Sequence, residues 1–400
     1  MRMPYFALMH TLSLGLPCFH RPLSRVFSVT ASQPTAPTRS TSRVLYEPIE
    51  SVERMEYYQK GGYHPMNIGD HFHARYRVVH KLGHGTYSTI WLARDEISKR
   101  YVAVKICTAY SDPLETNVLS QLSEPPKSSD IGATMIPSIL DKFNIQGPNG
   151  NHACLVTSPA RMSLSEAKDG SWIGLFQIDV ARALAAQLVT VTRYMHSQGL
   201  LTTKELYERY GEPELEPVNL LDGQTPPPGV PKHGVVPIWL GEPTRFQPTV
   251  PLTFSSDTWT LACTIWDIVA QRSLFEGFLT NEDDMTCQQI AALGPLPIEW
   301  WDKWEGRADH FNDDGEPINR ATSQYRSLGD AFEINIQQPR SQAGMPPLEL
   351  SERDAFFAML RPMLSFRPED RPSAQQVLES DWMVNWAIPE YEKIRSLEES

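Results

Sequence analysis

The chain has 400 residues, of which 41% are hydrophobic, so it can bury a large core and is expected to divide into lobes. Its 36 Lys and Arg residues are outnumbered by 48 Asp and Glu residues, and the net charge of -12 argues against direct nucleic-acid binding, which needs clustered positive charge. An acidic surface suits basic protein partners instead.

The cysteines and the apolar runs narrow the class of protein further. The five cysteines are scattered along the chain, odd in number and without a Cys-x-x-Cys pair. This pattern favours a reducing compartment and predicts neither a disulfide framework nor a zinc site. No apolar run reaches the ~18 residues that a membrane-spanning helix needs, so we expect no membrane association.

The amino-terminal end has an unusual composition. The first 46 residues contain no Asp or Glu, while five arginines lie among many Ser and Thr residues. This composition is typical of a mitochondrial transit peptide, and a disordered basic arm over residues 1–45 is the alternative. Folded structure is expected to begin near Tyr46, with an amino-terminal extension over residues 46–74.

A small, mostly β lobe is predicted over residues 75–158, and its first turn is rich in glycine. Apolar alternation predicts strands over 75–82, 90–94 and 101–106. Gly83 and Gly85 follow the first strand, where the lack of a side chain lets the backbone approach phosphates. Lys105 ends the third strand, where its ammonium can pair with the α- and β-phosphates of a nucleotide. The alternative is an ordinary glycine-containing β-hairpin with a surface lysine.

A helix is expected to follow the third strand. Asp112 is suited to the N-cap and Pro113 to the first helical position, and apolar residues recur at helical spacing after them. Glu115 has two candidate roles. It can close a capping box, or it can form the ion pair that orients Lys105, which we favour.

The end of the lobe is predicted to be a strand and a hinge. Residues 151–157 are apolar enough for a strand, and residues 157–160 follow as the hinge, where backbone groups of Ser158 and Ala160 can read the edge of adenine. A plain strand and turn is the alternative.

The remainder, residues 159–392, is predicted to be a larger helical lobe. Apolar spacing predicts a long amphipathic helix over 176–196, with Gly199 as its stop. Residues 211–251 are rich in Pro and Gly and are expected to be an extended surface linker. A tail is expected over 393–400. Four further helices are predicted, over residues 256–269, 299–304, 355–364 and 374–382.

Several stretches give the chain a family resemblance. From about Leu45 to Glu392 it resembles the SR-protein kinases, in particular a fungal branch of this serine/threonine kinase family. The resemblance implies an α+β, bilobal protein-kinase-like fold with a small β-rich N-lobe and a larger helical C-lobe. Beyond the glycine turn, the matching stretches are Tyr46-Glu-Pro-Ile-Glu-Ser-Val-Glu, Gly61-Gly-Tyr-His-Pro, Leu206-Tyr-Glu-Arg-Tyr-Gly-Glu-Pro-Glu, Ser256-Asp-Thr-Trp-Thr-Leu-Ala-Cys and Phe366-Arg-Pro-Glu-Asp-Arg-Pro-Ser-Ala.

The resemblance carries expectations about ligands and partners. It implies a monomer that uses ATP and Mg to phosphorylate Ser in Arg/Ser-rich proteins, acts in the regulation of mRNA splicing, and is found in the cytoplasm and nucleus. The acid-free amino terminus makes the mitochondrion the alternative location. The positions expected to contact ATP are Leu82, Gly83, His84, Gly85, Thr86, Tyr87, Ser88, Ile90, Ala103, Lys105, Ser158 and Ala160.

Two blocks of the family pattern are missing, so the C-lobe is expected to be incomplete. After Leu201 the family has a catalytic loop with an Asp and an Asn, and after Gly241 it has an Asp-Phe-Gly segment; neither is found here. Asp222-Gly223 lies in the polar linker and is a poor substitute. No catalytic residue and no metal ligand can therefore be identified.

Two structural residues of the family lose their expected partners. The resemblance implies that Asp257 anchors the catalytic loop and that Arg371 pairs with a glutamate that closes the activation segment. Because these partners are missing, we expect both side chains to be solvated or the helical lobe to be rearranged or unstable. The alternative is a helix-capping Asp and a surface Arg.

Three functions remain open. The first, which we favour, is a working SR-type kinase of which this sequence is an incomplete reading, inactive as it stands. The second is a pseudokinase scaffold with weak or no nucleotide binding. The third is a non-kinase interaction protein that keeps only the β lobe. The two missing blocks coincide with the catalytic loop and the Asp-Phe-Gly segment of the family. This favours the first function, because a pseudokinase that arose by point substitution would keep these loops with altered residues.

Overall fold

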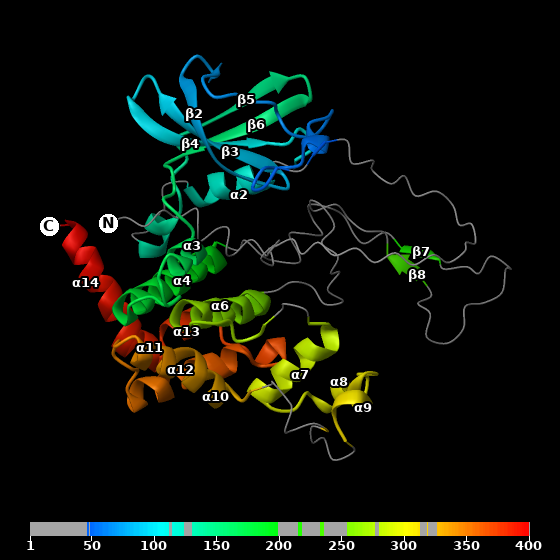
Figure 1. Cartoon of the computed structure of the whole chain (residues 1–400), viewed down its shortest axis with the longest axis vertical. Coiled ribbons are helices and arrows are strands. Elements are labelled where there is room, and N and C mark those ends of the chain that lie inside the picture. Colours follow the sequence, from blue (N-terminus) through cyan, green and yellow to red (C-terminus); the bar gives the residue numbers. More distant parts are fainter. Residues whose placement is uncertain are drawn as a thin grey trace. The chain divides into compact units, whose positions relative to one another are not determined.

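The chain forms two compact units, one containing a sheet and the other helices (Figure 1). The computed structural model describes residues 46–47, 49–111, 114–123, 130–198, 215–217, 233–235, 254–276, 280–312, 318 and 326–399. The β-rich unit contains the described residues up to Ser120 together with Pro137–Arg161, and the helical unit contains the described residues of Gln121–Ile136 and Met162–Ser400. The fold class is therefore α+β, with a β-rich N-terminal unit and a helical C-terminal unit.

The β-rich unit is built on an antiparallel sheet of six strands in the order β1-β2-β3-β4-β6-β5. The four strands that the apolar alternation predicts are confirmed. The strand β5 was missed, although Asn149-Gly150 after it is a common hairpin signal. The strands are β1 (His71–Phe72), β2 (Tyr76–Gly85), β3 (Ser88–Asp95), β4 (Arg100–Cys107), β5 (Asp141–Gly147) and β6 (Gly150–Thr157).

One face of this sheet carries the hydrophobic core of the unit. Successive side chains of a strand point to opposite faces, so every second residue of β4 enters the core. Val102, Val104 and Ile106 are at most 1% exposed. They pack with a cluster that also contains Phe72, Tyr76, Val78, Trp91, Ala93, Cys154 and Val156. The opposite face of β3 and β4 does not take part in this core cluster.

The amino-terminal extension is part of the β-rich unit. A 3-10 turn (Met55–Tyr57) precedes a segment whose backbone bonds to the loop after β4. The amide of Tyr110 donates to the carbonyl of Gly61 at 2.9 Å, and the amide of Gly61 donates to the carbonyl of Asn149 at 2.7 Å. Gly61 has a φ of +89°, a conformation that favours glycine.

The helical unit is organised around two long helices. The helices α4 (Ile178–Ser197) and α6 (Phe254–Val269) confirm the predicted helices at 176–196 and 256–269. Around them lie α3 (Leu164–Asp169), α7 (Glu282–Leu293), α8 (Ile298–Trp301), α9 (Arg307–His310), α10 (Leu328–Phe332), α11 (Gln338–Gln342), α12 (Leu350–Met363), α13 (Ala374–Leu378) and α14 (Ile388–Glu399). The helix α14 covers residues 393–399, which were expected to be a tail.

Aromatic rings and one buried ion pair fill the centre of the helical unit. The ring of Phe356 lies 6.4 Å from that of Trp266 and 5.0 Å from that of Trp382, measured between centroids. Arg182 of α4 donates to both carboxylate oxygens of Glu352 of α12, at 2.8 and 2.5 Å. The Glu352 side chain is 1% exposed, so this pair joins the two helices inside the unit.

Part of the predicted linker and several predicted helix ends fall outside the described residues. Asp112, Pro113 and Gly199 lie outside them, as does most of 211–251. Within that linker the structure describes β7 (Leu215–Pro217) and β8 (His233–Val235), which pair in an antiparallel manner. No helix among the described residues combines the length and apolar character needed to cross a membrane.

Candidate nucleotide-binding site

The glycine turn lies between β2 and β3. The strand β2 ends at Gly85 and β3 begins at Ser88, so Thr86 and Tyr87 form the turn itself. Gly83 pairs with Ile90 after an irregularity in the register. A Cβ atom built at Gly83 or Gly85 would meet no atom within 4 Å. The backbone here therefore borders open space, as a phosphate-binding turn requires.

Lys105 lies beside the glycine turn on the neighbouring strand. It is the pairing partner of Ile90 of β3 and of Leu155 of β6. Directly opposed residues of antiparallel strands point to the same face of the sheet. Lys105 therefore shares a face with Ile90 and with Ala103, which is two residues earlier. This face is opposite the one that Val102 and Val104 bury in the core.

The predicted hinge residues come directly after strand β6, which pairs with β4. Thr157, the last residue of β6, pairs with Ala103. Ser158 comes next and is exposed, and Ala160 is half-buried. Their backbone groups therefore begin next to the strand position that is expected to lie along adenine.

The remaining predicted contact residues lie around the tip of the hairpin. Leu82 is 46% exposed and Tyr87 is 41% exposed, whereas Ser88 is 6% exposed. His84 and Thr86 are exposed as well. The strand pairing thus brings together Gly83, Ile90, Ala103 and Lys105. The backbone of α2 (Leu114–Ser123) is described, but the side chain of Glu115 is not, so the predicted Lys105–Glu115 ion pair lies outside the described part.

A buried carboxylate, that of Glu53, contacts strand β2 and was not predicted from the sequence. Glu53, 4% exposed, accepts hydrogen bonds from the ammonium of Lys81 and the hydroxyl of Tyr58. Burial alone would raise the pKa of Glu53, but these hydrogen bonds hold it below its ordinary value. Burial and the bond to Glu53 raise the pKa of Tyr58. Lys81 is two residues before Gly83, so this network supports the strand that leads into the turn.

Tyr63 makes a second contact with the glycine turn. Its hydroxyl donates to the carbonyl oxygen of Gly85 at 2.8 Å and lies 3.2 Å from that of Thr86. Tyr63 and Glu53 belong to two stretches that distinguish the SR-protein kinase resemblance. That resemblance was the available signal, but it does not say which side chains reach the turn.

The chain has named relatives that match most of its length. No family model matches it. A serine/threonine protein kinase of Aspergillus fumigatus is 28% identical over 404 residues, which span 92% of this chain and 99% of the relative. A serine/threonine-protein kinase SRPK of Physarum polycephalum is 26% identical, over 83% of this chain and 91% of the relative. Human SRSF protein kinase 3 is 42% identical over 111 residues, 27% of this chain and 20% of that protein.

The chain is a homologue of the SR-type serine/threonine protein kinases. Its β-rich and helical units are the N-terminal and C-terminal parts of a protein-kinase-like fold. Over the residues described, no group of three or more His, Cys, Asp or Glu side chains is placed to hold a metal ion.

In this SR-kinase homologue, the carboxylate of Asp257 contacts a histidine side chain. Loss of its catalytic-loop partner was the prediction, and complete solvation in place of that partner is wrong, because Nε2 of His196 lies 3.0 Å from its Oδ2 atom. The alternative, a helix-capping Asp, is wrong as well, since Asp257 is the fourth residue of α6. His196 lies near the end of α4. The side chain of Asp257 is 34% exposed, so water also screens this charge.

Arg371 is satisfied by main-chain oxygens. Its guanidinium donates to the carbonyls of Ser365 at 2.7 Å, Ser255 at 3.0 Å and Phe366 at 3.1 Å. It also lies 4.8 Å from the centre of the Trp259 ring, within the range of a cation–π contact. Both the expectation of a partnerless Arg371 and the alternative of a surface arginine are therefore wrong.

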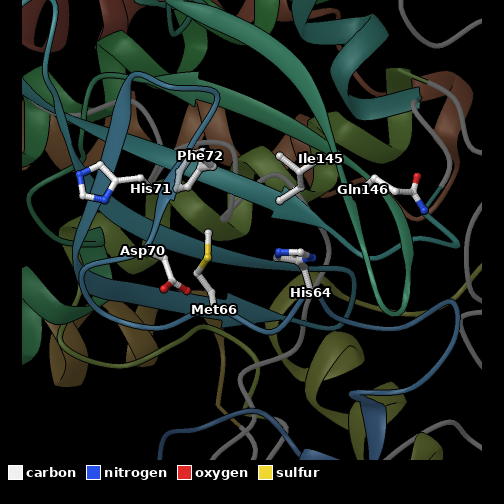
Figure 2. A pocket seen from close by; sticks show the side chains of 7 residues that line it. All are labelled: His64, Met66, Asp70, His71, Phe72, Ile145 and Gln146. Carbon is white, nitrogen blue, oxygen red and sulfur yellow. The ribbon is translucent and has the colours of Figure 1, made fainter.

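A pocket of about 370 Å³ lies elsewhere in the β-rich unit. Figure 2 shows His71 at one end of it and His64 and Gln146 at the other. Its lining contains none of the residues predicted to contact ATP. It is therefore separate from the candidate site. The lining residues are His64, Met66, Asp70, His71, Phe72, Ile145 and Gln146.

Proposed function

We propose that this SR-kinase homologue binds ATP on the open face of its N-terminal sheet. The observation that supports this most is the row of paired residues Gly83, Ile90 and Lys105 across three strands. The open backbone at Gly83 and Gly85 would admit the phosphates, and the ammonium of Lys105 would neutralise them. Ala103 would lie along the adenine ring, and the backbone of Ser158 and Ala160 would hydrogen-bond to its edge.

The reaction proposed for the complete enzyme type is transfer of the ATP γ-phosphate to Ser in Arg/Ser-rich proteins. The names of SRSF protein kinase 3 and of the SRPK relative support this substrate class. The net charge of -12 is suited to attracting such basic substrates. Mg would supply neutralisation of the phosphate charge in this chemistry.

We propose that the chain with this sequence binds nucleotide without transferring phosphate. Phosphoryl transfer needs an Asp that orients the attacking hydroxyl and side chains that hold the metal. Residues 202–210 follow Leu201 directly and contain neither an Asp nor an Asn. The Asp-Phe-Gly segment is absent as well, so we assign no metal ligand and no catalytic base.

The test separates nucleotide binding from phosphate transfer. The full chain is titrated with a fluorescent ATP analogue and is incubated with labelled ATP and an Arg/Ser peptide. We expect binding that Lys105→Met abolishes, and no labelled peptide. Lys99→Met is the control, because Lys99 has a 67% exposed side chain away from the turn. Labelled peptide that disappears with Lys105→Met would show that the chain is active, and the absence of binding would contradict the nucleotide site.

A second candidate is the working kinase, encoded by a longer transcript of the same gene. The two missing blocks coincide with the chemistry, while the surrounding motifs keep their detail. Sequencing of transcripts and genomic DNA between the codons for Leu201 and Thr202, and around Gly241, tests this. In-frame coding sequence for a catalytic loop and an Asp-Phe-Gly segment would favour it. Uninterrupted coding sequence would favour a pseudokinase scaffold.

We propose a location in the cytoplasm and nucleus, with the mitochondrion as the alternative. The Arg-containing, acid-free residues 1–45 support the alternative. Fluorescently tagged full-length chain and chain that begins at Tyr46 would separate the two. Mitochondrial signal that depends on residues 1–45 would favour import.

A further inference from the structure

The amino-terminal extension reaches the glycine turn from a fixed base. We call residues 49–66 the N-terminal brace. The amides of Ala109 and Tyr110 donate to the carbonyls of Gly62 and Gly61, at 3.1 and 2.9 Å. Asn149, between β5 and β6, donates its side-chain amide to the carbonyl of Tyr63 at 2.7 Å. The brace is thereby fixed to two connections of the sheet.

Tyr63 extends from this base to the tip of the hairpin. The residue is 3% exposed, and its hydroxyl donates to the carbonyl of Gly85 and lies within 3.2 Å of that of Thr86. Two more rings of the brace hold it in place. The Tyr58 ring lies 5.5 Å from the Tyr63 ring, and the Tyr57 ring packs edge-on at 6.3 Å. A buried aromatic hydroxyl normally has such a partner, but here the partner is the turn that is predicted to hold phosphate.

Glu53 provides a second, independent contact. Its carboxylate accepts from the ammonium of Lys81, which also lies 5.3 Å from the centre of the Trp91 ring. The Glu53 side chain is 1% exposed and that of Lys81 is 24% exposed. The brace thus contacts β2 on both sides of Gly83, once before it and once after it.

These contacts solve a problem that glycine creates. A glycine-rich turn has many accessible backbone conformations, and a ligand must pay the entropy of ordering them. The hydroxyl of Tyr63 restricts the turn through its carbonyl oxygens. It does not compete for backbone N–H groups, which are the groups that bind phosphate. The turn can therefore be ordered in advance while its donors stay available.

We propose that the N-terminal brace positions the glycine turn for nucleotide and that Tyr63 is the positioning residue. The ligand in this inference rests on the proposed function, whereas the ordering of the turn does not. Tyr63 acts through Gly85 and Thr86, whose carbonyl oxygens its hydroxyl contacts.

The test compares the full chain with Tyr63→Phe, which removes one hydroxyl. Tyr101→Phe is the matched control, because Tyr101 is 52% exposed on β4. Hydrogen–deuterium exchange of residues 83–88 is measured without ligand, the melting temperature is recorded, and a fluorescent ATP analogue is titrated. We expect faster exchange in the turn and a dissociation constant raised about threefold to tenfold, the factor that one hydrogen bond supplies. The melting temperature should change little, and Tyr101→Phe should match the wild type in all three.

The outcomes distinguish the two proposals. Unchanged exchange in the turn of Tyr63→Phe would overturn the positioning role. So would faster exchange with unaltered nucleotide affinity, since the hydroxyl would then be merely structural. If the wild type binds no nucleotide, the proposed function fails, while exchange still decides whether Tyr63 orders the turn. If Tyr63→Phe does not fold, Glu53→Gln is measured instead, and the same changes are expected from loss of the Lys81 ion pair.

Discussion

The imidazole Nε2 atom of His196 lies 3.0 Å from the carboxylate Oδ2 atom of Asp257. The His196 ring also stacks on Phe254 at 4.3 Å between centroids. The pair joins the end of α4 to the first turn of α6. A carboxylate that was expected to be left without a partner is therefore used to connect the two long helices of the C-terminal unit.

This pair should contribute to the stability of the helical unit. We expect His196→Ala to lower the free energy of unfolding by about 1 kcal/mol, because the hydrogen bond is to a charged group that water partly screens. Urea unfolding of His196→Ala, Asp257→Ala and the double variant measures the coupling. Additive effects of the two single changes would show that the contact contributes nothing, and coupling near the single-variant loss would support it.

A larger loss is expected at the buried pair of Arg182 and Glu352. Glu352→Gln keeps the size of the side chain but leaves the guanidinium of Arg182 with only the more distant carboxylate of Glu390, at 3.9 Å. Because Arg182 is only 18% exposed and loses its two close hydrogen bonds to a carboxylate, we expect the free energy of unfolding in urea to fall by about 3 kcal/mol.

Arg272→Ala is the control for this change, since the Arg272 side chain is 67% exposed in its pair with Glu276. Exposed pairs contribute about 0 to 1 kcal/mol. Equal losses for Glu352→Gln and Arg272→Ala would contradict the role given to the interior pair.

The attachment of the extension should depend on pH through His64. Its ring lies 4.9 Å from that of His152 between centroids, and its buried Nδ1 atom has no hydrogen-bond partner among the described residues. Burial, and then repulsion from His152, lower the pKa of His64, while Asp70 acts in the opposite direction. The His64 ring therefore binds a proton less readily in the folded state than in the unfolded state.

The sign follows from this difference. The contribution of His64 to the free energy of unfolding is complete while the ring is neutral. It declines as the pH falls through and below the ordinary histidine pKa of about 6.5. His64→Phe keeps a ring over Gly147 and removes the proton site, so it should flatten this part of the profile. Unfolding midpoints are compared at about pH 7.5 and about pH 5.5 for both proteins. An equally steep decline in His64→Phe would assign the effect to other groups.

The strands around the candidate site could be predicted because their signal is local. Apolar alternation identified β2, β3 and β4, whereas the pairing of Ile90 with Lys105 became visible only in the register of the sheet. The side-chain contacts of the brace could not be predicted, because they join residues 22 and 28 positions apart, Tyr63 with Gly85 and Glu53 with Lys81. No periodic pattern encodes such contacts.

The error at Asp257 and Arg371 has a different physical origin. A resemblance predicts which partner a charged side chain has in other proteins, but not which donors or acceptors replace that partner. His196 is a helix-terminal histidine whose sequence position gives no sign of this role. For Arg371 the replacement acceptors are backbone carbonyl oxygens. Every residue has one, so no sequence pattern can indicate which of them an arginine will contact.

Arg371 also bears on how such a chain tolerates change. Its three main-chain acceptors belong to the start of α6 and to the connection after α12. A guanidinium that donates to three carbonyl oxygens holds these two segments together without any acidic side chain. The link should therefore persist when the side chain of Ser255, Ser365 or Phe366 is changed, as long as the main chain keeps its path.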